Sequence, residues 1–106
     1  MDFFNFFKAK DINAGVQDFL STDGAVLLDV RTQEEYAEGH IERSKNLPLQ
    51  DINQAENFIK DKHTPIFVHC RSGGRSAQAT TILKKMGYTN VNDIGGILSY
   101  RGKVVK

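Results

Sequence analysis

Two short apolar runs containing β-branched residues constrain the fold of this chain more than any other feature. They occupy residues 25–30 (Ala-Val-Leu-Leu-Asp-Val) and 65–69 (Pro-Ile-Phe-Val-His). Strands with apolar residues at successive positions are typical of sheets that are covered on both faces, and such sheets are usually parallel. We therefore expect both runs to be strands of a parallel sheet flanked by helices.

Helical patterns alternate with these runs. The expected helices cover 11–20, 33–38, 53–60 and 75–86, and a further strand is expected over 88–94. Alternation of strands and helices predicts an α/β fold. The 106 residues are 40% hydrophobic and 25% charged, and we find no repeat or linker among them. We expect residues 1–106 to form a single domain.

The chain has one cysteine, Cys70, which follows the second apolar run directly. The next five residues include two adjacent glycines, which permit positive φ, so that successive N–H groups can turn inward before a helix begins. Such a cradle attracts anions, and a thiolate is an anion. We therefore expect the pKa of Cys70 to lie below that of a free cysteine, which is about 8.5, and we expect Cys70 to act as a nucleophile. The loop residues expected to bind the substrate are Arg71, Ser72, Gly73, Gly74 and Arg75.

The two loop arginines are unusual because they stand at the positive end of a helix dipole. A cation is unfavourable there unless an anion is bound. This placement favours substrate-anion binding by Arg75, whereas for Arg71 the same role and an ordinary solvated position are equally well supported.

The end of the first apolar run carries two charged residues, Asp29 and Arg31. They share one side of an extended strand, which predicts a partly buried, structural ion pair. Because ligands of open α/β sheets bind beyond the carboxyl ends of the strands, this pair should lie near the loop, with Glu34 or Glu35 close by. His69 should point to the opposite side of its strand from Cys70, which argues against an acid or base role.

Charge and cysteine content exclude several classes of function. The 14 basic and 13 acidic residues are interspersed, so no nucleic-acid-binding stripe is expected. A single cysteine forms neither an intramolecular disulfide nor a CxxC metal site, and it fits a reducing compartment. Residues 1–8 hold four phenylalanines, but the acid Asp2 stands where a signal peptide needs basic residues, and the apolar part is too short for a signal peptide or a membrane span. We expect a cytoplasmic protein without a membrane partner, whose phenylalanines cover a sheet or form a docking patch.

Four motifs occur in one order along the chain. They are Leu28-Asp29-Val30-Arg31-Thr32-Gln33-Glu34-Glu35-Tyr36-Ala37-Glu38-Gly39-His40-Ile41, then Asn46-Leu47-Pro48, then Cys70 to Ser76, then Gly95-Gly96. With them the chain resembles the single-domain rhodanese-type sulfurtransferases, from about Asp11 to Gly102. The resemblance implies a three-layer α/β fold with a five-stranded, mostly parallel sheet. It also implies a catalytic cysteine that carries a sulfane sulfur as a persulfide, without a cofactor or metal.

Carried over to this chain, the resemblance implies that Cys70 is the nucleophile. It also implies that the backbone amides of residues 71–75 bind the outer sulfur of the persulfide. Sulfur would pass from thiosulfate or a low-molecular persulfide to a thiol or cyanide, with a protein sulfur acceptor as an alternative. Some two-domain thiosulfate sulfurtransferases have a basic residue before the tyrosine and a lysine third in the loop. This chain has Glu35 and Ser72 there, so the donor stays open. It also has Tyr100-Arg101 where relatives often have Trp-Pro.

Two other functions use similar residues. In cysteine-dependent phosphatases, which arsenate reductases resemble, five residues separate the cysteine from the arginine. In this chain four residues separate Cys70 from Arg75. A loop one residue shorter should hold a sulfur atom better than a tetrahedral phosphate. The third possibility is a noncatalytic rhodanese-like binding module, but such modules have lost the cysteine that this chain retains.

Overall fold

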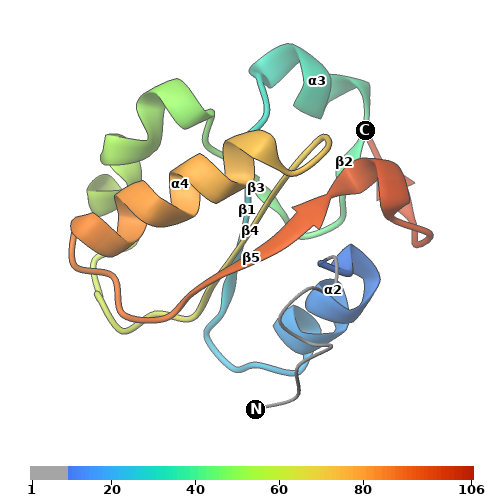
Figure 1. Cartoon of the computed structure of the whole chain (residues 1–106). Coiled ribbons are helices and arrows are strands. Elements are labelled where there is room, and N and C mark those ends of the chain that lie inside the picture. The colour runs from blue at the N-terminus through green and yellow to red at the C-terminus, as the bar shows by residue number, and fades with distance from the viewer. Residues whose placement is uncertain (1–9) are drawn as a thin grey trace.

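The structure is a computed structural model that describes residues 10–106, and helices flank its central sheet (Figure 1). The Phe-rich segment lies outside the described residues. In chain order the elements are α2 (Ile12–Leu20), β1 (Val26–Asp29), α3 (Gln33–Glu38), β2 (His40–Ile41), β3 (Lys45–Asn46), the 3₁₀ helix η1 (Leu49–Asn57), β4 (Ile66–Cys70), α4 (Gly74–Lys85), β5 (Val91–Gly96), the short 3₁₀ helix η2 (Ile97–Ser99) and β6 (Val104–Val105).

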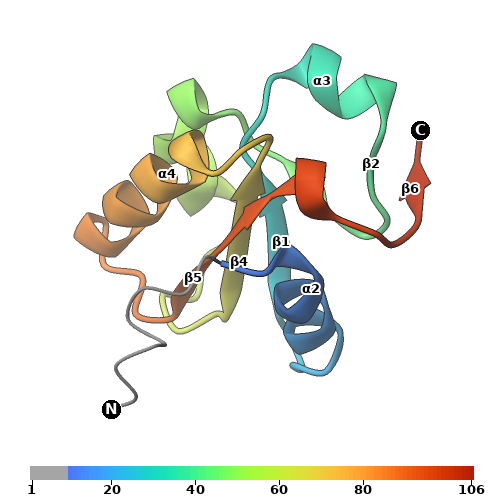
Figure 2. The same cartoon turned by 45° about the vertical axis from the view of Figure 1, so that its right-hand side comes forward.

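The central sheet has the strand order β3-β1-β4-β5, and all its neighbouring strands are parallel. The two apolar runs of the sequence are its adjacent strands β1 and β4, paired so that Leu28 lies opposite Val68 and Asp29 opposite His69. The expected α/β fold with a parallel sheet is confirmed. The described part of the chain contributes four strands to this sheet rather than the expected five. β2 and β6 pair with each other, antiparallel and apart from the sheet (Figure 2).

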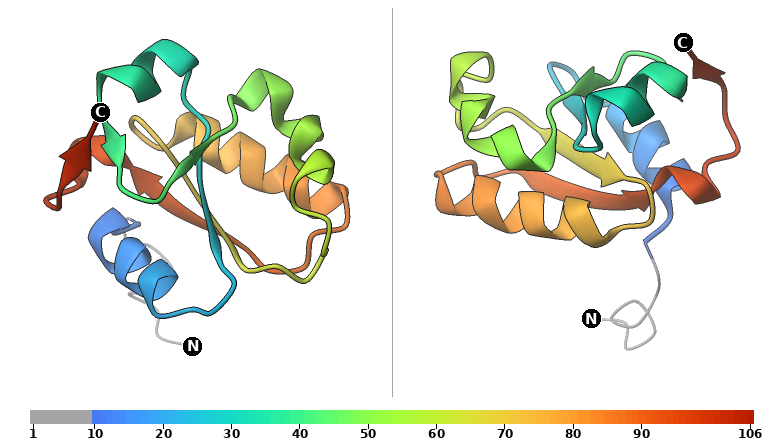
Figure 3. Two further views of the ribbon diagram at one scale, coloured as in Figure 1. Left: turned by 180° about the vertical axis from the view of Figure 1, so that it is seen from behind. Right: turned by 90° about the horizontal axis from the view of Figure 1, so that it is seen from above.

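Helices cover both faces of the sheet, which explains the unbroken apolar runs (Figures 1 and 3). Successive strand residues point to opposite faces. Leu27 and Phe67 pack with α2 on one face, while Leu28 and Val68 pack with η1 and α4 on the other. Both faces are therefore apolar, and in β1 and β4 the polar residues Asp29 and His69 stand at the carboxyl ends of the strands.

Most element boundaries match the expected ones, and two differ. The helix expected over 53–60 is instead the 3₁₀ helix η1, which starts after Pro48. Its buried residues Ile52 and Ala55 are three positions apart, which matches the three-residue repeat of a 3₁₀ helix. The strand expected over 88–94 is β5, which continues through Gly95 and Gly96.

No helix within residues 10–106 combines the length and the apolar character that crossing a bilayer would need.

Candidate active site

The loop between β4 and α4 forms the floor of the candidate site. Cys70 is the last residue of β4, and Gly73 is the N-cap of α4 with a φ of 114°. This positive φ, which glycine adopts without strain, turns the backbone so that the Gly73 N–H donates to the Cys70 Sγ at 3.0 Å. The expected cradle therefore exists, although of the two adjacent glycines only Gly73 adopts positive φ.

The Cys70 thiol lies beneath this loop, and the residue is only 1% exposed. Burial disfavours its thiolate. Hydrogen bonds from Ser76 and from the backbone of Gly73 and Arg75 outweigh that effect, so the pKa of Cys70 lies below its ordinary value. The thiol is thus buried and yet ionises more readily than an ordinary cysteine.

Ser76 is a site residue that the sequence reasoning missed. Its hydroxyl is buried and lies 3.5 Å from the Cys70 Sγ, 3.1 Å from the Gly73 carbonyl oxygen and 3.5 Å from the Gly95 carbonyl oxygen. As the third residue of α4, Ser76 points back over the first turn of the helix. That position within the helix, counted from the glycine pair, is the signal that would have identified it.

The end of β5 forms a wall against the loop. Gly96 pairs with Cys70 across the sheet, and a Cβ at Gly96 would lie 2.4 Å from the Arg71 carbonyl oxygen. The same oxygen accepts a hydrogen bond from the Leu98 N–H at 3.2 Å. The backbone contact leaves no room for any side chain at position 96.

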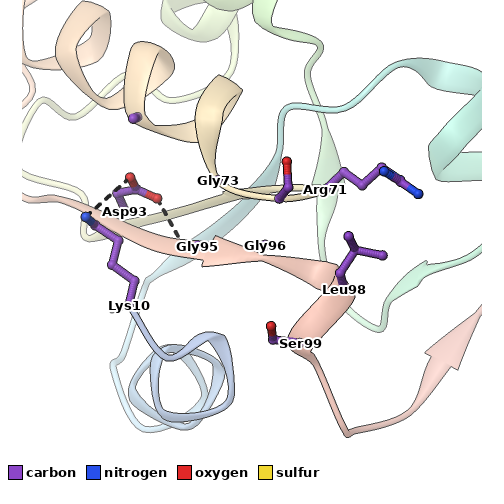
Figure 4. Close-up of a pocket in the computed structure, with 10 residues that line it drawn as sticks. Lys10, Arg71, Gly73, Asp93, Gly95, Gly96, Leu98 and Ser99 are labelled. Atoms are coloured by element: carbon purple, nitrogen blue, oxygen red, sulfur yellow. Dashed lines mark hydrogen bonds and ion pairs between the residues drawn. The ribbon is translucent and has the colours of Figure 1, made fainter. Parts of the chain in front are cut away.

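Two cavities open beside the loop, and both are lined by Arg71 and Leu98. The larger, about 420 Å³, reaches from the loop to an ion pair between Lys10 and Asp93 (Figure 4). The smaller, about 330 Å³, extends toward α3 and is lined by Glu35 among others. In Figure 4 the exposed Arg71 side chain extends away from the Lys10–Asp93 pair. Arg71 therefore carries a positive charge at the mouth of the site.

Arg75 is held by a carboxylate. Its guanidinium donates two hydrogen bonds to Glu35, at 2.6 and 3.0 Å, which joins the start of α4 to α3. The hydrogen bond from Arg75 lowers the pKa of Glu35 to about 2. The expected proximity of Glu35 to the loop is confirmed, and the charge of Arg75 is shared with this partner. Binding of a substrate anion by Arg75 stays a prediction.

Asp29 and Arg31 form the expected ion pair at the end of β1. Asp29 is fully buried and accepts from the Arg31 guanidinium at 2.7 to 3.0 Å, and Arg31 also donates to the Gly39 carbonyl oxygen. The pair therefore ties the strand end to the segment after α3, which fits a structural role.

His69 and His40 both lie away from the sulfur chemistry. His69 is fully buried, with Nε2 at 3.9 Å from the Asp29 carboxylate and without a hydrogen-bond partner among the described residues. Burial lowers the pKa of His69, although Asp29 opposes that shift, so the ring is neutral near pH 7. His40 stacks on Tyr36 with ring centroids 3.7 Å apart. Neither ring contacts the Cys70 sulfur.

The chain is similar to several known proteins. Residues 13–103 match the family described as Rhodanese-like domain. The chain is 37% identical over 71 residues to thiosulfate sulfurtransferase PspE of Escherichia coli, covering 66% of this chain and 68% of that protein. It is 36% identical over 91 residues to thiosulfate sulfurtransferase 18 of Arabidopsis thaliana, covering 73% of this chain and 66% of that protein, just under two thirds.

A solved structure described as a rhodanese with anions from E. coli superposes with a TM-score of 0.72 at 34% identity. The superposition covers 77% of this chain and 98% of that one.

Proposed function

The chain belongs to the rhodanese-like domain family, and from that premise we propose that it transfers sulfane sulfur through a persulfide on Cys70. The observation that carries the proposal is the hydrogen-bonding of the Cys70 sulfur. The Gly73 N–H at 3.0 Å and the Ser76 hydroxyl at 3.5 Å favour a thiolate that needs no separate base. Relatives named as thiosulfate sulfurtransferases support the reaction class.

The reaction has two balanced steps. The Cys70 thiolate attacks the outer sulfur of the donor, a new S–S bond forms, and the electron pair of the broken bond leaves with the remainder, which is sulfite when the donor is thiosulfate. An acceptor then attacks the outer sulfur of the persulfide. Cyanide becomes thiocyanate, a thiol becomes a persulfide, and the Cys70 thiolate is regenerated.

The loop supplies the electrostatic part of catalysis. Both the persulfide and the departing group are anionic, so N–H groups already aimed at the sulfur stabilise them without reorganisation. We assign this role to the amides of residues 71–75 and to the start of α4. Arg71 at the mouth attracts an anionic donor, while the Asp29–Arg31 pair keeps the strand end rigid.

The length of the loop favours sulfur over phosphate as the transferred group. Four residues lie between Cys70 and Arg75. The Arg75 guanidinium, which would bind a phosphate, already donates hydrogen bonds to Glu35. A noncatalytic binding module would not need a hydrogen-bonded thiolate. A low-molecular thiol, cyanide or a protein as acceptor, and a cytoplasmic location, remain predictions.

A side-by-side assay tests this function. Thiosulfate, a low-molecular persulfide, mercaptopyruvate and an aryl phosphate are each offered to the wild-type protein and to Cys70→Ser. We expect intact-protein mass spectrometry to show one added sulfur atom on the wild-type protein only, with transfer to cyanide or a thiol. Far-ultraviolet circular dichroism confirms that the variant is folded. Absence of added sulfur with every sulfur donor, or turnover of the aryl phosphate alone, contradicts the proposal.

A further inference from the structure

The cavity on the α3 side of the loop is balanced in charge. Its lining includes two carboxylates and two guanidinium groups, those of Glu35, Glu38, Arg31 and Arg71. Arg31 is already paired with Asp29. A donor that approaches from this side therefore meets no strongly positive potential. Such a potential would attract a dianion more than a monoanion.

Glu35 is linked to the loop through its partner, Arg75. It holds the Arg75 guanidinium in a two-bond ion pair. Hydrogen bonding to Glu35 raises the pKa of Arg75, and the nearby charge of Cys70 adds to that effect. Three charges thus act on one another in the order carboxylate, guanidinium, thiolate. The carboxylate therefore offsets the positive charge that Arg75 brings to the first turn of α4, five positions after Cys70.

The position of Glu35 is fixed by local structure as well as by Arg75. Its carboxylate accepts from the Thr32 N–H at 3.0 Å and from the Thr32 hydroxyl at 3.1 Å, while the Glu35 N–H donates back to that hydroxyl. This is the capping box of α3. A carboxylate held by both a cap and an arginine has a pKa of about 2 and is therefore ionised near neutral pH.

We infer that Glu35 is a specificity-determining residue that, by neutralising Arg75, tunes the site toward singly charged sulfane donors over doubly charged ones. The inference rests on the proposed function and refines it. Glu35 acts through Arg75, so it is a positioning residue rather than a catalytic one. An organic persulfide or a thiosulfonate carries one negative charge in its reacting group, whereas thiosulfate carries two.

Two donors that differ by one charge make the test sharp. Thiosulfate gives its outer sulfur to the Cys70 thiolate and releases sulfite. Methanethiosulfonate gives the same sulfur and releases methanesulfinate. In both reactions one S–S bond forms, one S–S bond breaks, and the leaving group keeps the electron pair. The ratio of kcat/KM for thiosulfate to that for methanethiosulfonate, with cyanide as acceptor, therefore reports the charge preference.

Glu35→Gln is the main variant, because glutamine also completes a capping box and only the charge is lost. It frees Arg75, and we expect the ratio to rise about three- to tenfold, as one partly screened unit charge near the donor would produce. Arg75→Gln leaves the carboxylate without its cation, and the ratio should fall. Glu34→Gln removes the same charge from the exposed neighbouring position of α3 and should change the ratio by less than about twofold.

The outcomes separate this inference from the proposed function. An active wild-type protein whose ratio is the same in Glu35→Gln and Glu34→Gln overturns the inference alone, as does a ratio that moves in the same direction in Glu35→Gln and Arg75→Gln. Opposite movements in these two variants, weaker at high salt, establish it. A wild-type protein that takes sulfur from neither donor refutes the proposed function itself.

Discussion

Replacing Ser76 by alanine removes a side-chain hydroxyl that lies 3.5 Å from the Cys70 Sγ. This hydroxyl has a single proton, for which the carbonyl oxygens of Gly73 and Gly95 are acceptors, and its oxygen accepts from the Cys70 thiol at 3.5 Å. While Cys70 is protonated, the hydroxyl donates to the closer Gly73 oxygen at 3.1 Å. When Cys70 ionises, rotation of the hydroxyl lets it donate to the thiolate. The Gly73 oxygen keeps the hydrogen bond from the Ala77 N–H.

The size of the effect follows from this exchange. A hydrogen bond to a charged group contributes about 1.5–3 kcal/mol and one to a neutral group about 0.5–1.5 kcal/mol, so the exchange favours the thiolate by roughly 1–1.5 kcal/mol. Because one pKa unit corresponds to about 1.4 kcal/mol, Ser76→Ala should raise the pKa of Cys70 by about one unit. At a pH below the wild-type pKa, the thiolate fraction of Ser76→Ala should be about tenfold lower than that of the wild type. The rate of sulfur uptake should be lower by the same factor.

Alkylation by iodoacetamide across a pH series measures this pKa directly, because only the thiolate reacts. Ser44→Ala is the matched control, since Ser44 is also buried but donates to the Ile41 carbonyl oxygen, in another part of the fold. The control should leave the alkylation profile unchanged. If Ser76→Ala gives the wild-type profile, the hydroxyl does not stabilise the thiolate and the reasoning fails.

Three further predictions concern the packing and charge around the site. Gly96→Ala places a Cβ 2.4 Å from a loop carbonyl oxygen and should cost about 1–3 kcal/mol in thermal unfolding as well as most of the activity. Gly74→Ala meets no atom within 4 Å and should unfold like the wild type; equal losses in both variants would contradict the close contact. Arg31→Leu leaves the fully buried Asp29 carboxylate without its cation and should destabilise the fold by roughly 3–5 kcal/mol in urea unfolding, whereas a loss below about 1 kcal/mol would show that the pair is not structural. The pKa of Glu35 is lowered to about 2, so its ionised form should stabilise the wild type relative to Glu35→Gln above about pH 4.5, and this advantage should disappear as the pH falls toward 2; parallel stability curves would refute it.

The local parts of the site were predictable because short-range patterns determine them. An apolar run that ends at Cys70, followed by two glycines and a helical pattern, indicates a strand, a turn and a helix without reference to the rest of the chain. The alternation of Asp29 and Arg31 likewise predicts a shared side of the strand. The structure shows the turn at Gly73 and the ion pair at β1.

The 3₁₀ helix η1 and the strand count were less accessible. Over residues 53–60 the apolar spacing resembled an α-helix, whereas packing of Ile52 and Ala55 against the core selects a tighter repeat beginning after Pro48. The short strands β2 and β6 are far apart in the sequence: Ile41 pairs with Val104, 63 positions later, and His40 pairs with Val105, 65 positions later. Two-residue strands have too little pattern to be recognised before their partner is known.

By itself the sequence determined the local frame of the candidate site: one thiol at a strand end, a short glycine loop and a helix that begins beside it. Only the tertiary structure decided what surrounds that thiol. The Ser76 hydroxyl lies over the sulfur because α4 starts in one particular orientation. Glu35 reaches Arg75 across 40 residues because β1 and β4 are neighbours, which brings the segments that follow them together. Pattern rules act over a few residues, whereas these contacts depend on the order of strands in the sheet.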